Sequence, residues 1–378
     1  MKILLLFWGL WFLNFSTRTI LSPLLPIFEK EMGFGYALAG SLFLYLSLGY
    51  TGSLVAAGWI VPRVGFKKAI ALGFFILIAA FAALVLIKSY AHLVVVAFFL
   101  GLGGGIYLPC ALPLLTSAIP PDKWGKSIAF HETAASSSIL ATPLLVAAAL
   151  AFTGWPTLVM ALSALCLAMI LTFLILLPEP SQKGEDKFTF SRVLHRRDFW
   201  IMAVLWAFAA AGGLGLYNLI PLFLVNEKGL PLDTANTVFG VSRLGGLALI
   251  FVAGFLMDRF GVRKVLLASL LVSGFATAGL AVAQGFTLVV GMLVLQATSI
   301  PVFFPAGLVA ISRLTDYADR SAFTGATLAV GVVFGTGIAP TLLGFIADIR
   351  DFQTGIFFQG VLTMLACVLL PLLRKIRQ

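Results

Sequence analysis

Long apolar runs, separated by short polar segments, make up most of the chain. A helix needs about 20 consecutive apolar residues to cross the hydrocarbon core of a bilayer. The pattern predicts one transmembrane helix for each run and therefore an all-α membrane protein with twelve spans. They lie near residues 3–28, 36–61, 69–88, 91–116, 126–152, 156–177, 199–225, 234–257, 265–284, 286–312, 321–347 and 353–373.

Composition also indicates a membrane protein. Hydrophobic residues form 61% of the chain and charged residues 11%, whereas a soluble domain is about 45–50% apolar and about 25% charged. The amino-terminal run carries Asn14 and Arg18 and lacks a small-residue cleavage site. We therefore interpret it as a permanent span rather than a secretory signal.

Lysines and arginines collect in alternate loops, which predicts the orientation of the chain. Such an excess marks cytoplasmic loops, so both termini are expected in the cytoplasm, which requires an even number of spans. The net charge of +10 then comes from these loops, and membrane lipids rather than nucleic acid are the expected partner. The cytoplasmic set is Lys2, Arg63, Lys67, Lys68, Lys123, Lys126, Lys183, Lys187, Arg192, Arg196, Arg197, Arg259, Arg263, Lys264, Arg313, Arg320, Arg374, Lys375 and Arg377, against Lys30, Lys88, Lys228 and Arg350 on the opposite side.

The chain divides into two similar halves. A polar stretch at 179–198 predicts a cytoplasmic linker between six-helix bundles at 1–178 and 199–378. Residues 57–68 (AGWIVPRVGFKK) match residues 253–264 (AGFLMDRFGVRK) at an offset of 196. Such parallel six-helix repeats are one known architecture of secondary transporters. Shorter matches near the same offset pair Pro26 with Pro221, Gly33 with Gly229, and Pro143 with Pro340.

The second copy of this segment resembles the signature loop of the major facilitator superfamily, Gly-x-x-x-Asp-Arg-x-Gly-x-Arg-Lys. It stands complete from Gly254 through Asp258 and Arg259 to Lys264. The resemblance implies two pseudo-symmetric six-helix bundles and a cytoplasmic gate that involves Asp258, Arg259 and Arg63. In the first copy Pro62 replaces the acidic residue, so the gate is expected to depend mainly on Asp258.

A finer resemblance links two spans to the organic anion:cation symporter branch, which moves sugar acids and related carboxylates. The segment from Asn14 through Arg18 to Pro26 is similar to that branch's first-span motif, with Thr17 in place of its aspartate. Residues 101–109 are similar to the fourth-span motif. There, Gly104 and Ala97 replace the branch's glutamate and arginine. These departures leave the fold assignment intact but not the branch's proton-coupling scheme.

Three ionisable residues lie within predicted spans: Arg18, Glu132 and Arg243. Such residues are expensive in lipid and normally face a cavity. Two arginines from opposite halves favour a carboxylate or phosphate ligand, which a guanidinium binds bidentately. Asn14, one turn before Arg18, joins this predicted substrate site. The alternative is that each arginine caps carbonyls or pairs with an acid, although Glu132 alone could not neutralise both.

Glu132 and its neighbour His131 form a predicted proton-coupling site. A carboxyl within a span can exchange a proton as a cavity opens and closes, and the histidine can tune it. A structural salt bridge to Arg18, or a charge in the cytoplasmic gate, explains Glu132 equally well.

Four further polar residues are candidate ligand contacts: Tyr107, Tyr217, Asn218 and Gln296. Each is explained as well by a hydrogen bond between helices.

We therefore expect a secondary transporter for a small organic anion, working by symport with protons or by antiport with a counter-anion. The alternatives are an exporter of lipophilic, drug-like or lipidic compounds, favoured by the aromatic content of 13%, and a receptor or scaffold that does not transport. No P-loop, HExxH motif or nucleophile triad is visible, so we expect neither an enzyme nor a cofactor or metal. A monomer in a bacterial or archaeal inner membrane is the expected setting.

Overall fold

A computed structural model describes residues 2–120, 123–177, 193–315 and 317–373. In this part of the chain the secondary structure is helical, without a strand. Twelve helical stretches of the described residues are long and apolar enough to cross a membrane, which confirms the predicted number. Most of the predicted linker and the basic carboxyl-terminal tail fall outside the described residues. The division into 1–178, 179–198 and 199–378 therefore stays a prediction.

The chain forms two compact units. Unit 1 consists of Met1–Phe34, Tyr45–Asp186 and Pro231–Thr237, and unit 2 of Gly35–Leu44, Lys187–Leu230 and Val238–Gln378. Each unit thus includes a short segment from the other half of the sequence.

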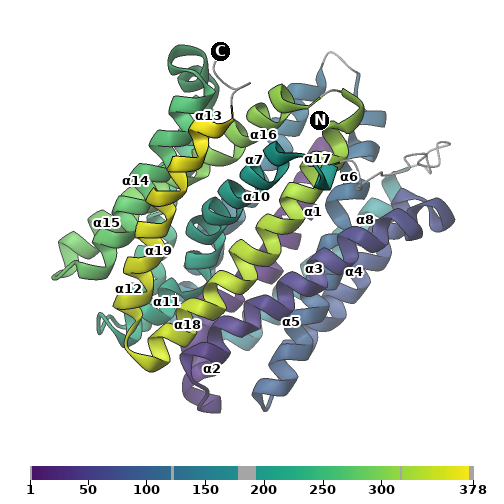
Figure 1. The fold of residues 1–378 in the computed structure, drawn as a ribbon. Coiled ribbons are helices and arrows are strands. Elements are labelled where there is room, and N and C mark those ends of the chain that lie inside the picture. Colours follow the sequence, from purple (N-terminus) through teal and green to yellow (C-terminus); the bar gives the residue numbers. More distant parts are fainter. Residues whose placement is uncertain (1, 121–122, 178–192, 316, 374–378) are drawn as a thin grey trace. The chain divides into compact units, whose positions relative to one another are not determined.

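The first half of the sequence supplies six of the twelve spans, and several consist of two shorter helices. Helices α4 and α5 pack side by side in unit 1 (Figure 1). The elements are α1 (Lys2–Thr19), α2 (Leu21–Met32), α3 (Tyr36–Val64), α4 (Phe66–Ala83), η1 (Leu84–Leu86), α5 (Tyr90–Gly105), α6 (Tyr107–Ser117), α7 (Trp124–Phe152) and α8 (Trp155–Leu176).

The second half supplies the other six spans. Helix α14 lies beside α15 and α19 in unit 2 (Figure 1). The elements are α10 (Arg197–Ala210), η3 (Ala211–Gly215), α11 (Leu216–Asn226), α12 (Leu232–Val241), α13 (Leu244–Phe260), α14 (Val262–Val282), α15 (Phe286–Ser299), η4 (Ile300–Val302), α16 (Phe303–Leu314), α17 (Tyr317–Val330), η5 (Gly331–Ile338), α18 (Ala339–Ile349), α19 (Phe352–Ala366) and η6 (Cys367–Leu372).

Prolines explain two of the interruptions within spans. Proline lacks a backbone N–H, and its ring collides with the carbonyl four residues before it. Helix α1 ends at Thr19, four residues before Pro23, and α5 ends at Gly105, four residues before Pro109. In unit 2, η3 and η5 are π-helical stretches within spans.

The sequence repeat is reproduced in the backbone. Gly33 and Gly229 follow a helix with φ of 66° and 65°, and Gly65 and Gly261 precede a helix with φ of 82° at both positions. These conformations are open to glycine and strained for residues with a Cβ. The offset of 196 found in the sequence therefore corresponds to the same turn made twice.

Each unit has its own apolar core and an apolar exterior. Phe7, Phe74 and Phe173 are fully buried in unit 1, as are Phe199 and Phe303 in unit 2. Large apolar side chains also lie outside, with Phe152 86% and Phe251 69% exposed. Such an apolar surface requires lipid as its solvent. Helices suit this solvent because they satisfy their own backbone hydrogen-bonding groups.

Polar side chains join α1 to α7 inside unit 1. Hydroxyl and indole groups replace apolar contacts along this interface, which explains why α7 carries small polar residues within a span. The pairs are Trp8 with Thr133 at 3.0 Å, Ser16 with Ser138 at 2.9 Å, and Thr19 with Thr142 at 3.3 Å.

In unit 2 the carboxylate of Asp348, at the end of α18, caps the start of α3. Its two oxygens accept hydrogen bonds from the backbone N–H groups of Tyr36 and Ala37, each at 2.8 Å. The first N–H groups of a helix lack partners within the helix. Asp348 therefore ties residues 36–44 of the second span to the eleventh span.

We predict that Asp348→Ala lowers the free energy of unfolding by about 1 kcal/mol, as for the loss of a helix N-cap. Asp348→Asn is the matched control, because it retains one carbonyl oxygen and should cost less. Unfolding of the detergent-solubilised protein measures both, and equal stability of the alanine variant and the wild type would contradict this role.

Candidate functional site

Arg243 lies in the turn that interrupts the eighth span between α12 and α13. Its side chain is buried, with an exposed fraction of 7%, and its Nε and Nη2 atoms have no hydrogen-bond partner among the described residues. The guanidinium carbon lies 5.1 Å from the ring centroid of Tyr217 and 4.9 Å from that of Phe239. Two aromatic faces are therefore its main neighbours.

This environment leaves the charge of Arg243 only partly compensated. Cation–π contacts are worth about 2 kcal/mol when desolvated, whereas the penalty for burying an unpaired ion is several kcal/mol. In the described part of the chain no carboxylate lies within ion-pair distance. The free Nε and Nη2 donors are two that can bind the two oxygens of a carboxylate or phosphate together.

Arg18 lies at the end of α1, near the interruption of the first span. Its Nε donates to the carbonyl oxygen of Asn14 at 3.3 Å, and its Nη2 donates to the Asn14 side-chain oxygen at 3.1 Å. Asn14 and Arg18 thus share a face, as their spacing predicts. The guanidinium carbon also lies 4.5 Å from the ring centroid of Phe15 and 4.7 Å from that of Tyr50.

Gly104 provides the space that Arg18 occupies. A Cβ at this position would lie 2.9 Å from Cδ and 3.0 Å from Nε of Arg18. The amide of Asn14 donates to the carbonyl of the same glycine at 3.2 Å. Gly104 departs from the fourth-span motif of the symporter branch, and it contacts Arg18, which agrees with the first-span motif.

Glu132 differs from the expectation of a carboxyl buried within a span. Its side chain is 48% exposed, whereas that of His131 is fully buried. The partner of Glu132 is His131, with Oε1 and Nδ1 3.0 Å apart, and not Arg18. Adjacent residues on a helix point in different directions, and this places the histidine inside and the carboxylate at the surface.

Tyr107 is fully buried and its hydroxyl is already bonded. It donates to the carbonyl oxygen of Phe7 at 2.9 Å and contacts Nε2 of His131 at 3.1 Å. These bonds favour the alternative that Tyr107 joins helices, in place of the expected ligand contact.

Two amide side chains donate to backbone carbonyls in the π-helical stretches of unit 2. Asn218 donates to the carbonyl of Thr336 at 3.3 Å, which lies four residues before Pro340 and therefore lacks its usual helical donor. Gln296 donates to the carbonyl of Gly212 in η3 at 2.7 Å, and its Oε1 has no partner among the described residues. Both predicted ligand residues thus have a structural bond.

Residues 7–246 and 219–378 match the profile of the Major Facilitator Superfamily, which together is nearly the whole chain. The chain belongs to the Major Facilitator Superfamily. It is therefore a multi-pass membrane protein of a transporter family, not of an enzyme family.

The relatives of this superfamily member are bacterial. It is 26% identical to the uncharacterized MFS-type transporter YfnC of Bacillus subtilis, over 97% of this chain and 92% of the relative. It is 25% identical to sugar efflux transporter A of Dickeya chrysanthemi, over 65% of this chain and 63% of the relative. It is 27% identical to the "probable sulfoacetate transporter SauU" of Cupriavidus necator, over 43% and 38%.

Solved structures show the same fold. The bacterial homologue of the human lysosomal transporter Spinster, in an inward-facing and occupied conformation, superposes with a TM-score of 0.81 and 16% identity, over 99% of this chain and 97% of that chain. The nucleoside transporter NupG superposes with a TM-score of 0.78 and 16% identity, over 99% and 100%.

The superfamily's signature loop makes no latch among the described residues. Asp258 is exposed and has no ion pair in this part of the chain. Arg259 lies over the ring of Phe260 at 5.5 Å, and Arg63 donates to the carbonyl of Trp59 at 2.6 Å. The cytoplasmic gate of Asp258, Arg259 and Arg63 stays a prediction.

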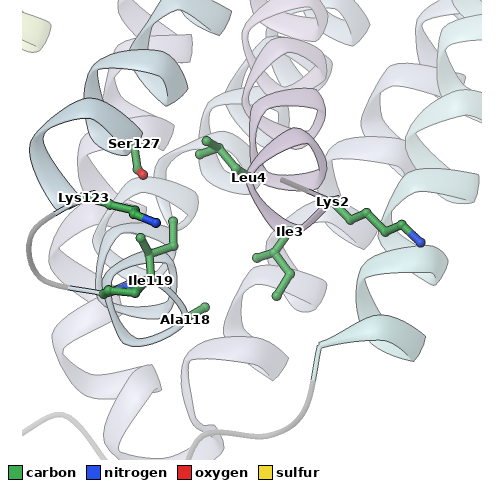
Figure 2. A pocket seen from close by; sticks show the side chains of 8 residues that line it. Lys2, Ile3, Leu4, Ala118, Ile119, Lys123 and Ser127 are labelled. Atoms are coloured by element: carbon green, nitrogen blue, oxygen red, sulfur yellow. The ribbon is translucent and has the colours of Figure 1, made fainter.

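A cavity of about 600 Å³ opens near the start of α1 in unit 1 (Figure 2). It is separate from the predicted substrate residues, since none of them lines it. Its lining is mainly apolar, with Lys123 and Ser127 as polar groups beside Lys2. The lining residues are Lys2, Ile3, Leu4, Ala118, Ile119, Pro120, Lys123 and Ser127.

The aromatic partners of the two arginines were not predicted from the sequence. Phe15 lies three residues before Arg18 and Phe239 four before Arg243, so helical spacing was a usable signal. Tyr50 comes from α3, and no local pattern indicates its contact with Arg18.

We predict that Gly104→Ala lowers the free energy of unfolding by about 1–3 kcal/mol, the usual cost of overpacking, because the new methyl group would displace Arg18 from Asn14. Gly52→Ala is the matched control, since a Cβ there meets no atom within 4 Å. Thermal unfolding in detergent compares the two, and equal stability of both variants would show that Arg18 adjusts without cost.

Proposed function

We propose that this transporter moves a small organic anion, bearing a carboxylate or phosphate, by alternating access. Coupling is to protons or to a counter-anion, and the protein acts as a monomer among membrane lipids. The observation that carries the proposal is the buried guanidinium of Arg243, whose Nε and Nη2 have no partner among the described residues.

The energetics of a buried charge support this ligand class. A buried cation without a counter-charge destabilises its surroundings, and a bound anion removes that cost. Arg18 supports the same choice, because Asn14 and three aromatic rings surround it without supplying a negative charge. An anion is thus the ligand that both environments lack.

One partial relative supports this class. It is named for sulfoacetate, a compound that carries a carboxylate and a sulfonate. The resemblance of the first span to the organic anion:cation symporter branch points the same way. Another relative is named for sugar efflux, so neutral sugars are included in the ligand panel for comparison.

Export of lipophilic compounds is the second candidate. Aromatic rings on both arginines favour it, because Tyr217, Phe239, Phe15 and Tyr50 present apolar faces beside each charge. An amphipathic anion would use the ring faces and the guanidinium together.

We predict that one class among carboxylates, phosphates, sulfonates, sugars and lipophilic cations raises the melting temperature of the purified protein, and that this class is anionic. Arg243→Ala should weaken its affinity about 100-fold, as expected when one partner of a buried charge pair is removed. Arg243→Lys should recover only part, because lysine cannot bind bidentately.

Arg350→Ala is the matched control, since this arginine is exposed and should leave affinity unchanged. Stabilisation by lipophilic cations alone, equal in wild type and Arg243→Ala, would contradict the proposal and favour the exporter.

A further inference from the structure

The hydrogen bonds of His131 determine where its protons lie. A tyrosine hydroxyl has one proton to donate, and a carbonyl oxygen can only accept. Because Tyr107 gives its proton to the carbonyl of Phe7 at 2.9 Å, its contact with Nε2 of His131 at 3.1 Å requires that Nε2 carries the hydrogen. Tyr107 therefore fixes the tautomer of the buried histidine.

The other ring nitrogen of His131 then faces Glu132. With Nε2 protonated, the 3.0 Å contact between Nδ1 and Oε1 needs one shared proton, on either the imidazole or the carboxyl. Without it, two lone pairs would face each other. The pair is thus neutral as a whole with the proton and carries one negative charge without it.

The pair joins a solvent-exposed carboxylate to a buried imidazole. Glu132 is 48% exposed and can exchange a proton with water, whereas His131 is fully buried. Trp11 and Tyr107 lie nearly parallel to the imidazole, with ring centroids 5.8 and 5.9 Å away. The proton can therefore enter through the exposed carboxylate and be shared with a buried ring whose other nitrogen contacts Tyr107.

The charged and titratable neighbours of the pair come from four elements of unit 1. Tyr107 lies on α6, Tyr50 on α3 lies against Arg18, and Lys126 precedes the pair on α7. Helix α8 packs on α7 without a charged residue. Arg18 on α1 lies 6.0 Å from the Trp11 ring, which itself is 5.8 Å from His131.

Resting on the proposed function, we propose that the coupling ion is a proton, held by the His131–Glu132 pair, and that Tyr107 is the positioning residue. Loss of the proton creates a negative charge that competes with a bound anion for Arg18. By reciprocity, proton and anion each favour the binding of the other. This linkage corresponds to symport.

The expected size follows from the geometry. The Glu132 carboxylate, which carries the charge after the proton is lost, lies within about 16 Å of Arg18, and at an effective dielectric constant of about 20–40 one unit charge there changes anion affinity about two- to sixfold. Affinity is higher at low pH, where the pair is neutral.

The first test needs no substrate. The chain has three histidines, so the full-length protein labelled with ¹⁵N-histidine in nanodiscs gives three sets of ring signals, and His131→Gln identifies the set of interest. Nε2 of His131 should carry its hydrogen wherever the ring is neutral, because Tyr107 fixes this tautomer. Tyr107→Phe should release this tautomer, whereas His92→Gln should not. A neutral His131 with the hydrogen on Nδ1 would overturn the inference.

The second test measures sulfoacetate affinity from pH 5 to 8 in wild type and Glu132→Gln. Wild type should bind about two- to sixfold more tightly at pH 5, and the variant should bind equally at all pH values. Binding without pH dependence in wild type would overturn proton coupling and leave the proposed anion transport standing. No binding at any pH, with the NMR result as expected, would instead count against the proposed function.

Discussion

A backbone carbonyl in the hydrocarbon core has no water to bond, so a carbonyl that lacks its helical donor needs a hydrogen bond from elsewhere in the protein. Asn218 donates to the carbonyl of Thr336, four residues before Pro340, and Gln296 and Gln359 donate to the carbonyls of Gly212 and Ala211 in the π-helical stretch η3. These bonds allow the spans of unit 2 to remain irregular, and irregular spans are where transporters form their sites. Arg243 lies in one more such interruption, between α12 and α13.

The absence of water in the hydrocarbon core constrains the two arginines as well as the backbone. Both arginines lie beside aromatic faces: Tyr217 and Phe239 for Arg243, and Phe15 and Tyr50 for Arg18, which also donates two hydrogen bonds to Asn14. Ring faces attract a cation without accepting conventional hydrogen bonds from all of its N–H groups. This is the basis for the anionic ligand that we propose, because its negative charge would offset the cost that each buried guanidinium carries.

The sequence predicts the fold well because lipid imposes a simple rule: each span needs enough apolar length. The repeat was also visible, and Gly65 and Gly261 share one φ because one turn occurs twice. Contacts of Arg18 with Asn14 follow from helical spacing. The exposure of Glu132 and the hydrogen bonds of Tyr107 did not follow from the sequence. They depend on how α1, α6 and α7 are rotated against each other, which periodicity alone does not determine.

The most direct test is flux into proteoliposomes of labelled sulfoacetate and of a lipophilic cation, tetraphenylphosphonium, for wild type and Arg243→Gln. We expect saturable anion flux in wild type, its loss in the variant, and no specific cation flux in either. Saturable cation flux that survives the substitution, without anion flux in wild type, would contradict the role assigned to the buried arginine.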